Sequence, residues 1–249
     1  MLAKQLIIRF NKTRIFDGFN WVIRGTKILM AKPVQLLLAS LPFLFGFAGI
    51  MWVNIQGVYS ASGGLLAAFI LSLIFPLSLQ AIVLAYKEFE EGGQIHLSKL
   101  YAQVFSFNKL RVILVYVLLV LFCSFASNYL FSLIEVDSAI LNYTFQCIFI
   151  VLQFIILLAV PLNIYSKSQF KPFHVLFLSL KGLLRNFIPC LTLIISAFAI
   201  LILAILIAKY IAVIAGKVAI IFYLLELWIF VTWLGTTAIA MYKSIFHLE

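Results

Sequence analysis

Long apolar stretches alternate with short polar segments along the chain. No charged residue lies between Pro33 and Tyr86, and four further stretches with few or no charges follow. A helix rises about 1.5 Å per residue, so about 20 apolar residues cross the roughly 30 Å hydrocarbon core of a bilayer. The pattern therefore predicts six membrane-spanning helices. They lie at residues 34–55, 65–86, 112–134, 141–165, 187–208 and 218–242.

The polar segments group these spans in pairs. Glycines and serines interrupt the first long apolar stretch at residues 56–64, and only a very short connection follows the third span. A membrane β-barrel would alternate apolar and polar residues in segments of about ten, whereas these runs are apolar on all sides. We expect an all-α polytopic membrane protein, with residues 1–249 forming one membrane domain of three helical hairpins. A cytoplasmic amphipathic segment precedes each hairpin, the first at residues 1–33.

Composition and charge support this class and orient the chain. Hydrophobic residues make up 65% and charged residues 10% of the sequence, and the mean hydropathy is +1.18. All Lys and Arg residues except Lys209 and Lys217 fall before spans one, three and five or after span six. The positive-inside rule then places both termini in the cytoplasm. The net charge of +10 is explained by topology, and no nucleic-acid-binding motif accompanies it.

The cytoplasmic segments carry basic residues beside apolar faces. In the first, Phe16, Phe19, Ile23 and Met30 recur at a spacing compatible with one helical face. Such helices lie in the membrane interface and are attracted to anionic headgroups of the inner leaflet. Two interpretations stay open, namely anchoring on lipid and docking of a cytoplasmic protein partner. The surface basic residues expected to take part are Arg14, Arg24, Lys27, Lys32, Lys181 and Arg185.

A repeat of roughly 78 residues runs through the chain. Tyr86, Tyr165 and Tyr242 each end an even-numbered span and are followed within two residues by a lysine. Tyrosine beside a basic residue is the usual headgroup-level anchor of a transmembrane helix. The regular spacing predicts one unit, an amphipathic segment followed by a hairpin, used three times.

Glu226 is the one formal charge inside a predicted span. An exposed carboxylate at that depth costs on the order of 2.5 kcal/mol, so it should face protein or water. Polar residues of other spans at a similar depth could form an intramembrane cluster with it. These are Gln146, Asn128 and Asn142. The cluster is either a functional acid with its partners or a structural hydrogen-bond anchor.

Three further polar residues lie toward the cytoplasmic half of the spans. Gln80, Gln153 and Asn163 could hydrogen-bond neighbouring helices together or line a polar path.

Signatures of enzymes and metal sites are missing from the sequence. His96, His174 and His247 all fall in cytoplasmic segments, away from Glu226. The three cysteines, Cys123, Cys147 and Cys190, show no spacing typical of a metal site. We expect them to be buried thiols. No phosphate-binding loop, nucleophile elbow or zinc-protease motif occurs. We therefore expect no catalytic residues, no metal and no cofactor.

Several short motifs occur between residues 18 and 246 and include an acidic, glycine-containing loop at residues 91–100. The motif at the entry into span one consists of Gly18, Trp21, Gly25 and Pro33. The element before span five contains Ser179, Lys181, Arg185, Asn186 and Pro189, and the ending contains Tyr242, Lys243, Ile245 and Phe246. Together these motifs resemble a family of small six-span bacterial inner-membrane proteins of unknown activity. The resemblance implies the six-span layout and a location in the bacterial inner, or cytoplasmic, membrane, and it brings no catalytic residues.

Two functions fit these features. The first is a non-enzymatic accessory or scaffold protein that contacts membrane lipids and a protein partner or a second copy of itself, with no role in nucleic-acid binding. The second is a small-solute or proton-coupled transporter that uses Glu226.

Overall fold

The computed structural model describes residues 8–55, 61–94, 96–133, 139–166, 170–216 and 219–248, and most of them are helical. The short helices are α1 (Asp17–Ala31), α2 (Pro33–Ala39), α5 (Leu97–Val104) and α8 (Pro172–Arg185). The long ones are α3 (Leu41–Ile55), α4 (Ala61–Glu90), α6 (Phe107–Leu133), α7 (Ala139–Tyr165), α9 (Phe187–Ala215) and α10 (Ala219–Ile245). Within these described residues, five helices are long and apolar enough to cross a membrane, or six if α2 and α3 form one bent span. The prediction of a mainly helical protein with several helices able to cross a membrane is confirmed at this level.

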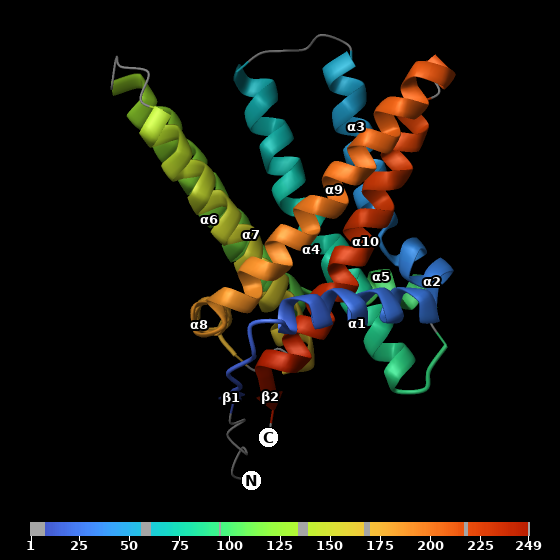
Figure 1. Ribbon diagram of the computed structural model, residues 1–249. Coiled ribbons are helices and arrows are strands. Elements are labelled where there is room, and N and C mark those ends of the chain that lie inside the picture. Colours follow the sequence, from blue (N-terminus) through green and yellow to red (C-terminus); the bar gives the residue numbers. More distant parts are fainter. Residues whose placement is uncertain are drawn as a thin grey trace.

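The long helices converge at one end of the molecule and diverge toward the other (Figure 1). At the convergent end α4, α7 and α10 contact one another. Fully buried small and aliphatic side chains fill the space between them, including Ala81, Ile82, Leu158, Ala159 and Ile239. Small residues let helices approach closely, so this end of the bundle is tightly packed.

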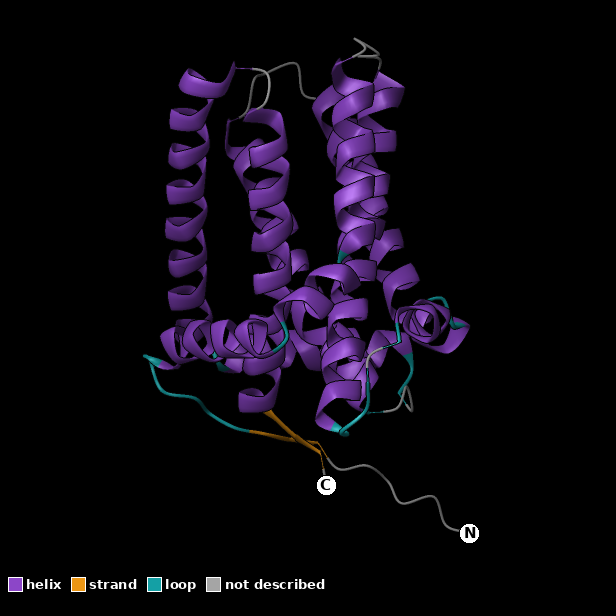
Figure 2. Ribbon diagram, turned by 90° about the vertical axis from the view of Figure 1, so that its right-hand side faces the viewer, coloured by secondary structure: helices purple, strands orange, loops and turns teal. Residues whose placement is uncertain are grey.

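Several short helices lie across the long ones near the convergent end, where both chain termini also lie (Figures 1 and 2). A short antiparallel pair joins the termini, formed by β1 (Ile8–Phe10) and β2 (Phe246–Leu248). The backbone N–H of Asn11 extends it by donating to the Ile245 carbonyl at 2.9 Å. This pairing was not predicted, because three residues are too few for a detectable alternation of apolar and polar positions.

The expected continuous helix at residues 34–55 is divided at Ser40, where α2 and α3 meet at an angle of 51°. Ser40 is fully buried, and its hydroxyl accepts a hydrogen bond from Trp228 Nε1 at 2.8 Å. The Thr232 hydroxyl lies 2.7 Å from the Ser40 hydroxyl. These side chains from α10 stabilise the break, and Pro42 in the first turn of α3 is compatible with it because the first turn needs no N–H donor.

Tyr101 of α5 also supports this break. Its hydroxyl donates to the Leu38 carbonyl of α2 at 2.7 Å. Burial raises the pKa of Tyr101 above its ordinary value, so the hydroxyl stays protonated and available as a donor. α5 is thereby tied to the last turn of α2.

Candidate functional site

The glycines of α1 bring this helix directly against α9 and α10. A Cβ atom on Gly18 would lie 2.9 Å from the Leu193 nitrogen, and one on Gly25 would lie 2.6 Å from the Thr237 Cα. Trp21 lies between them on the same buried face. The buried face of α1 thus consists of Gly18, Trp21, Gly25 and Leu29.

The opposite face of α1 presents large apolar side chains to the surroundings. Phe16 and Met30 are each 71% exposed, Ile23 is 53% exposed and Phe19 is 46% exposed. They are the residues that the sequence assigned to an interfacial face. With α1 docked through its glycines, these side chains stay exposed.

The other two short amphipathic helices show the same division. In α5, Leu100 and Val104 are buried, while Phe105 and Phe107 just beyond the helix are 59% and 71% exposed. α8 buries an apolar face and leaves outward-facing aromatic side chains. Those side chains are Phe173 and Phe177. Each of α1, α5 and α8 therefore packs one face on the bundle and has exposed phenylalanines on it or directly beside it.

The predicted surface basic residues all carry exposed side chains. They are Arg14, Arg24, Lys27, Lys32, Lys181 and Arg185. Because the first four belong to α1 and its flanks and the last two to α8, positive charge and exposed aromatic side chains occur on the same segments.

Glu226 lies on α10 and lines a cavity of about 450 Å³ with residues of α1 and α9. Its walls are mainly apolar and include Leu203, Ile207 and Phe230. Toward α1 the cavity meets Trp233, whose indole N–H donates to the Thr26 hydroxyl at 3.0 Å. The half-buried carboxylate is therefore the one charged side chain among the described residues that line this cavity.

The predicted partners of Glu226 are not among those lining residues. Gln146 is exposed on α7, and the first turns of α7 and α10 lie apart in Figure 1. The side chains of Asn128 and Asn142 lie outside the described part of the chain. Gln153 is half-buried on α7.

Gln80 and Asn163 hold the convergent end of the bundle together. Gln80 is fully buried and donates through Nε2 to the Val104 carbonyl at the end of α5, at 2.7 Å. Asn163 is 2% exposed and donates through Nδ2 to the Lys109 carbonyl near the start of α6, at 3.2 Å. Both contacts join a long helix to a neighbouring segment, as expected of hydrogen bonds between helices.

The three repeated tyrosines form a cluster that the sequence interpretation missed. The rings of Tyr165 and Tyr242 stack with centroids 5.0 Å apart, and Lys243 Nζ lies 5.0 Å from the ring centroid of Tyr86. Tyr165 donates to Glu90 Oε2 at 2.8 Å, and Lys243 forms an ion pair with Glu90. The regular spacing along the chain was the available signal, but it suggested three separate headgroup anchors.

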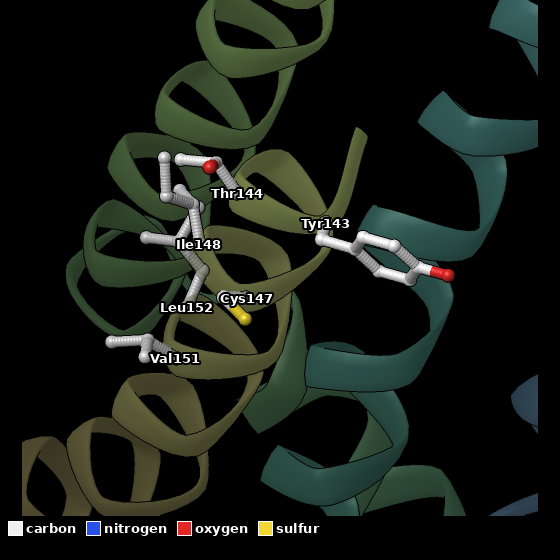
Figure 3. Close-up of a pocket in the computed structure, with 6 residues that line it drawn as sticks. All are labelled: Tyr143, Thr144, Cys147, Ile148, Val151 and Leu152. Carbon is white, nitrogen blue, oxygen red and sulfur yellow. The ribbon is translucent and has the colours of Figure 1, made fainter. Parts of the chain in front are cut away.

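A second apolar cavity, of about 610 Å³, lies along α7 (Figure 3). Its lining side chains come from one face of this helix and include Tyr143, Cys147 and Val151. None of the six side chains labelled in the figure is charged. The surface is suited to contact with lipid chains and offers no acid–base pair.

No protein-family model, curated protein or solved structure matches this chain.

Proposed function

We propose that this protein is a non-enzymatic accessory or scaffold protein of the bacterial inner membrane. It crosses the bilayer six times as three hairpins, keeps both termini in the cytoplasm and belongs to the six-span family that its motifs resemble. Its short helices α1, α5 and α8 contact anionic lipid and present a basic surface to a protein partner. The observation that carries this proposal is the recurrence of exposed phenylalanines on or beside the amphipathic helices α1, α5 and α8, near one end of the bundle.

The energetic argument combines burial and charge. Transfer of a phenylalanine side chain from water to an apolar environment is favourable by about 1.5–3 kcal/mol. A lysine or arginine near an anionic leaflet adds about 1 kcal/mol. Soluble surfaces rarely expose so many large apolar side chains together, whereas a membrane interface accommodates aromatic rings and basic groups at once.

Depth measurement tests the lipid contact. A spin label on Ile23→Cys, in a chain whose native cysteines are replaced by alanine, should be accessible to oxygen and protected from a water-soluble nickel complex. A label on Gln94→Cys, at an exposed position between α4 and α5, is the aqueous control. Equal nickel accessibility at the two positions would contradict the proposal.

Partner binding is tested separately. The double variant Lys181→Glu/Arg185→Glu should lose any protein that co-purifies with the chain in mild detergent, because it reverses the charge of α8. Retention of the same protein by the variant would show that the partner binds elsewhere. If neither form retains a protein, lipid remains the proposed contact of this surface.

Transport is the second candidate function, and the cavity lined by Glu226 is the observation that favours it. A proton-coupled transporter in proteoliposomes should show pH-dependent uptake that Glu226→Gln abolishes. The scaffold proposal expects no flux under any gradient, so this measurement separates the two functions.

A further inference from the structure

A polar cavity of about 470 Å³ lies between α1, the segment before it and the last turns of α10. Its charged lining consists of Lys12, Arg14, Arg24 and Lys243, with Asp17 as the one acidic side chain among the described lining residues. Lys243 is already paired with Glu90. In the described part of the chain, Lys12, Arg14 and Arg24 form no ion pair, so the cavity keeps an excess of positive charge.

The acidic residue is already occupied by other donors. Asp17 accepts the backbone N–H of Arg14 through Oδ2 at 2.6 Å, and Asn20 Nδ2 donates to Asp17 Oδ1 at 3.1 Å. Asp17 therefore fixes the backbone at the start of α1. Its contacts leave the guanidinium groups of Arg14 and Arg24 available for another acceptor.

Trp21 supplies a second, independent observation. This residue is fully buried and lines the same cavity, and its Nε1–H has no acceptor among the described residues. A buried indole N–H normally finds a partner. The cavity wall thus contains, besides the arginines, a residue with an unsatisfied buried donor.

Hydrogen bonds hold the wall opposite α1 in place. Asn11 Nδ2 donates to the Ser244 carbonyl at 3.3 Å. Thr13 donates to Oδ1 of the buried Asn186 through its backbone N–H at 2.8 Å and through its hydroxyl at 2.9 Å. The segment that carries Lys12 and Arg14 is thus tied to α10 and to the junction of α8 and α9.

We propose that this cavity, lined by Lys12, Arg14, Trp21 and Arg24, binds a phosphate group. Guanidinium groups recognise phosphate oxygens through paired, charge-assisted hydrogen bonds. The exposed Phe16 and Phe19 on the same helix would lie beside the apolar part of a phospholipid. The ligand is either the headgroup of an anionic phospholipid or free phosphate, and the lipid alternative rests on the proposed placement of α1 in the membrane interface.

Two double variants of the full chain test the site, because each removes two positive charges. Arg14→Gln/Arg24→Gln changes the cavity, and Lys171→Gln/Lys209→Gln changes exposed positions that belong neither to the cavity nor to the basic residues expected to meet lipid. Native mass spectrometry, after extraction from bilayers of phosphatidylcholine and phosphatidylglycerol, measures the retained anionic lipid. Retention should fall at least about tenfold in the cavity variant and less than about twofold in the control.

Calorimetry with inorganic phosphate, on the chain in detergent without anionic lipid, distinguishes the two ligand sources. Retained phosphatidylglycerol that depends on the arginines supports the headgroup. Arginine-dependent binding of inorganic phosphate, without lipid retention, supports free phosphate. Equal loss of lipid in the two double variants would contradict binding in the cavity. General attraction between the basic surface and anionic lipid would then explain the retention.

Absence of both ligands from the unsubstituted chain would also overturn the cavity site. The spin-label depth of Ile23 would still decide the membrane-surface proposal independently. Trp21→Phe keeps most of the ring and removes the N–H, so it should weaken binding by a smaller factor than the arginine variant. Thermal unfolding of each variant shows whether loss of binding reflects loss of the fold.

Discussion

Gly25 shows how one absent side chain positions a whole helix. A Cβ atom there would lie 2.6 Å from the Thr237 Cα, which belongs to the backbone of α10 and cannot rotate away. Gly25→Ala should therefore push α1 from α10 and destabilise the protein by about 1–3 kcal/mol. Thermal unfolding in detergent measures the loss as a lower Tm.

Gly49 is the matched control for this substitution. A Cβ atom on Gly49 would meet no atom within 4 Å. Gly49→Ala in α3 should leave the stability unchanged or raise it by up to about 1 kcal/mol, because alanine has the higher helix propensity. Equal Tm values for the two variants would show that α1 does not need the close approach.

Individual residues also show where sequence reasoning succeeded and where it failed. The exposed face of Phe16, Phe19 and Ile23 could be predicted because large apolar residues at helical spacing are easily recognised. The face of α1 that packs on α9 and α10 was not predicted, because Gly18 and Gly25 contribute no apolar side chain to such a pattern. The sequence interpretation used those glycines only in its resemblance argument; in the structure they pack α1 against α9 and α10.

At the scale of elements, the division of the first span into α2 and α3 depends on Ser40. Its hydroxyl donates to the Leu37 carbonyl at 2.9 Å and accepts from Trp228 at 2.8 Å. Ser40→Ala would leave the buried polar groups around it without this partner and should cost about 1–3 kcal/mol. Equilibrium unfolding in mixed detergent micelles would measure that loss.

Ser124 offers a control with a local hydrogen bond. Its hydroxyl donates to the Val120 carbonyl of the same helix at 2.9 Å. Ser124→Ala should stay within about 0.5 kcal/mol of the unsubstituted chain, because the substitution breaks no contact between helices. A similar cost for both serines would argue that the break at Ser40 does not depend on its contacts with α10.

Element boundaries differ from the expected spans for local reasons. α9 was expected to end at residue 208 but continues to Ala215 through the exposed Lys209. Lysine is a good helix former, and its long stem lies along apolar surface while the ammonium group reaches water. A charge therefore marks the edge of the hydrocarbon core, while the helix continues beyond it. A search for apolar stretches locates the edge of the core but not the end of the helix.

At the scale of the whole molecule, the convergence of α4, α7 and α10 could not be derived from one sequence. The 3.6-residue pattern shows which residues share a face, but these helices are apolar all round, so the pattern does not indicate which faces meet. Tyr86, Tyr165 and Tyr242 therefore looked like independent anchors. In the structure Tyr165 and Tyr242 stack, and Lys243 lies over Tyr86 and Tyr165, which joins the ends of the three helices.

We expect charge to decide the orientation of this assembly, and labelling tests this expectation directly. In a chain without native cysteines, Gln94→Cys lies at the convergent end, between α4 and α5, and Ser62→Cys lies in the first turn of α4. The positive-inside rule places Gln94 in the cytoplasm, because basic residues concentrate in the segments at that end. An impermeant maleimide on intact bacterial cells should therefore label Ser62→Cys at once and Gln94→Cys only after permeabilisation.

The reverse labelling pattern would place α1, α5 and α8 on the outer face of the membrane. Their basic residues would then lie away from the anionic lipids of the cytoplasmic leaflet, and the electrostatic part of the lipid-binding proposal would lose its support. The apolar contact of Phe16 and Phe19 would be unaffected, because burial of aromatic side chains does not depend on the sign of the surface charge. Labelling and spin-label depth thus test the two physical contributions separately.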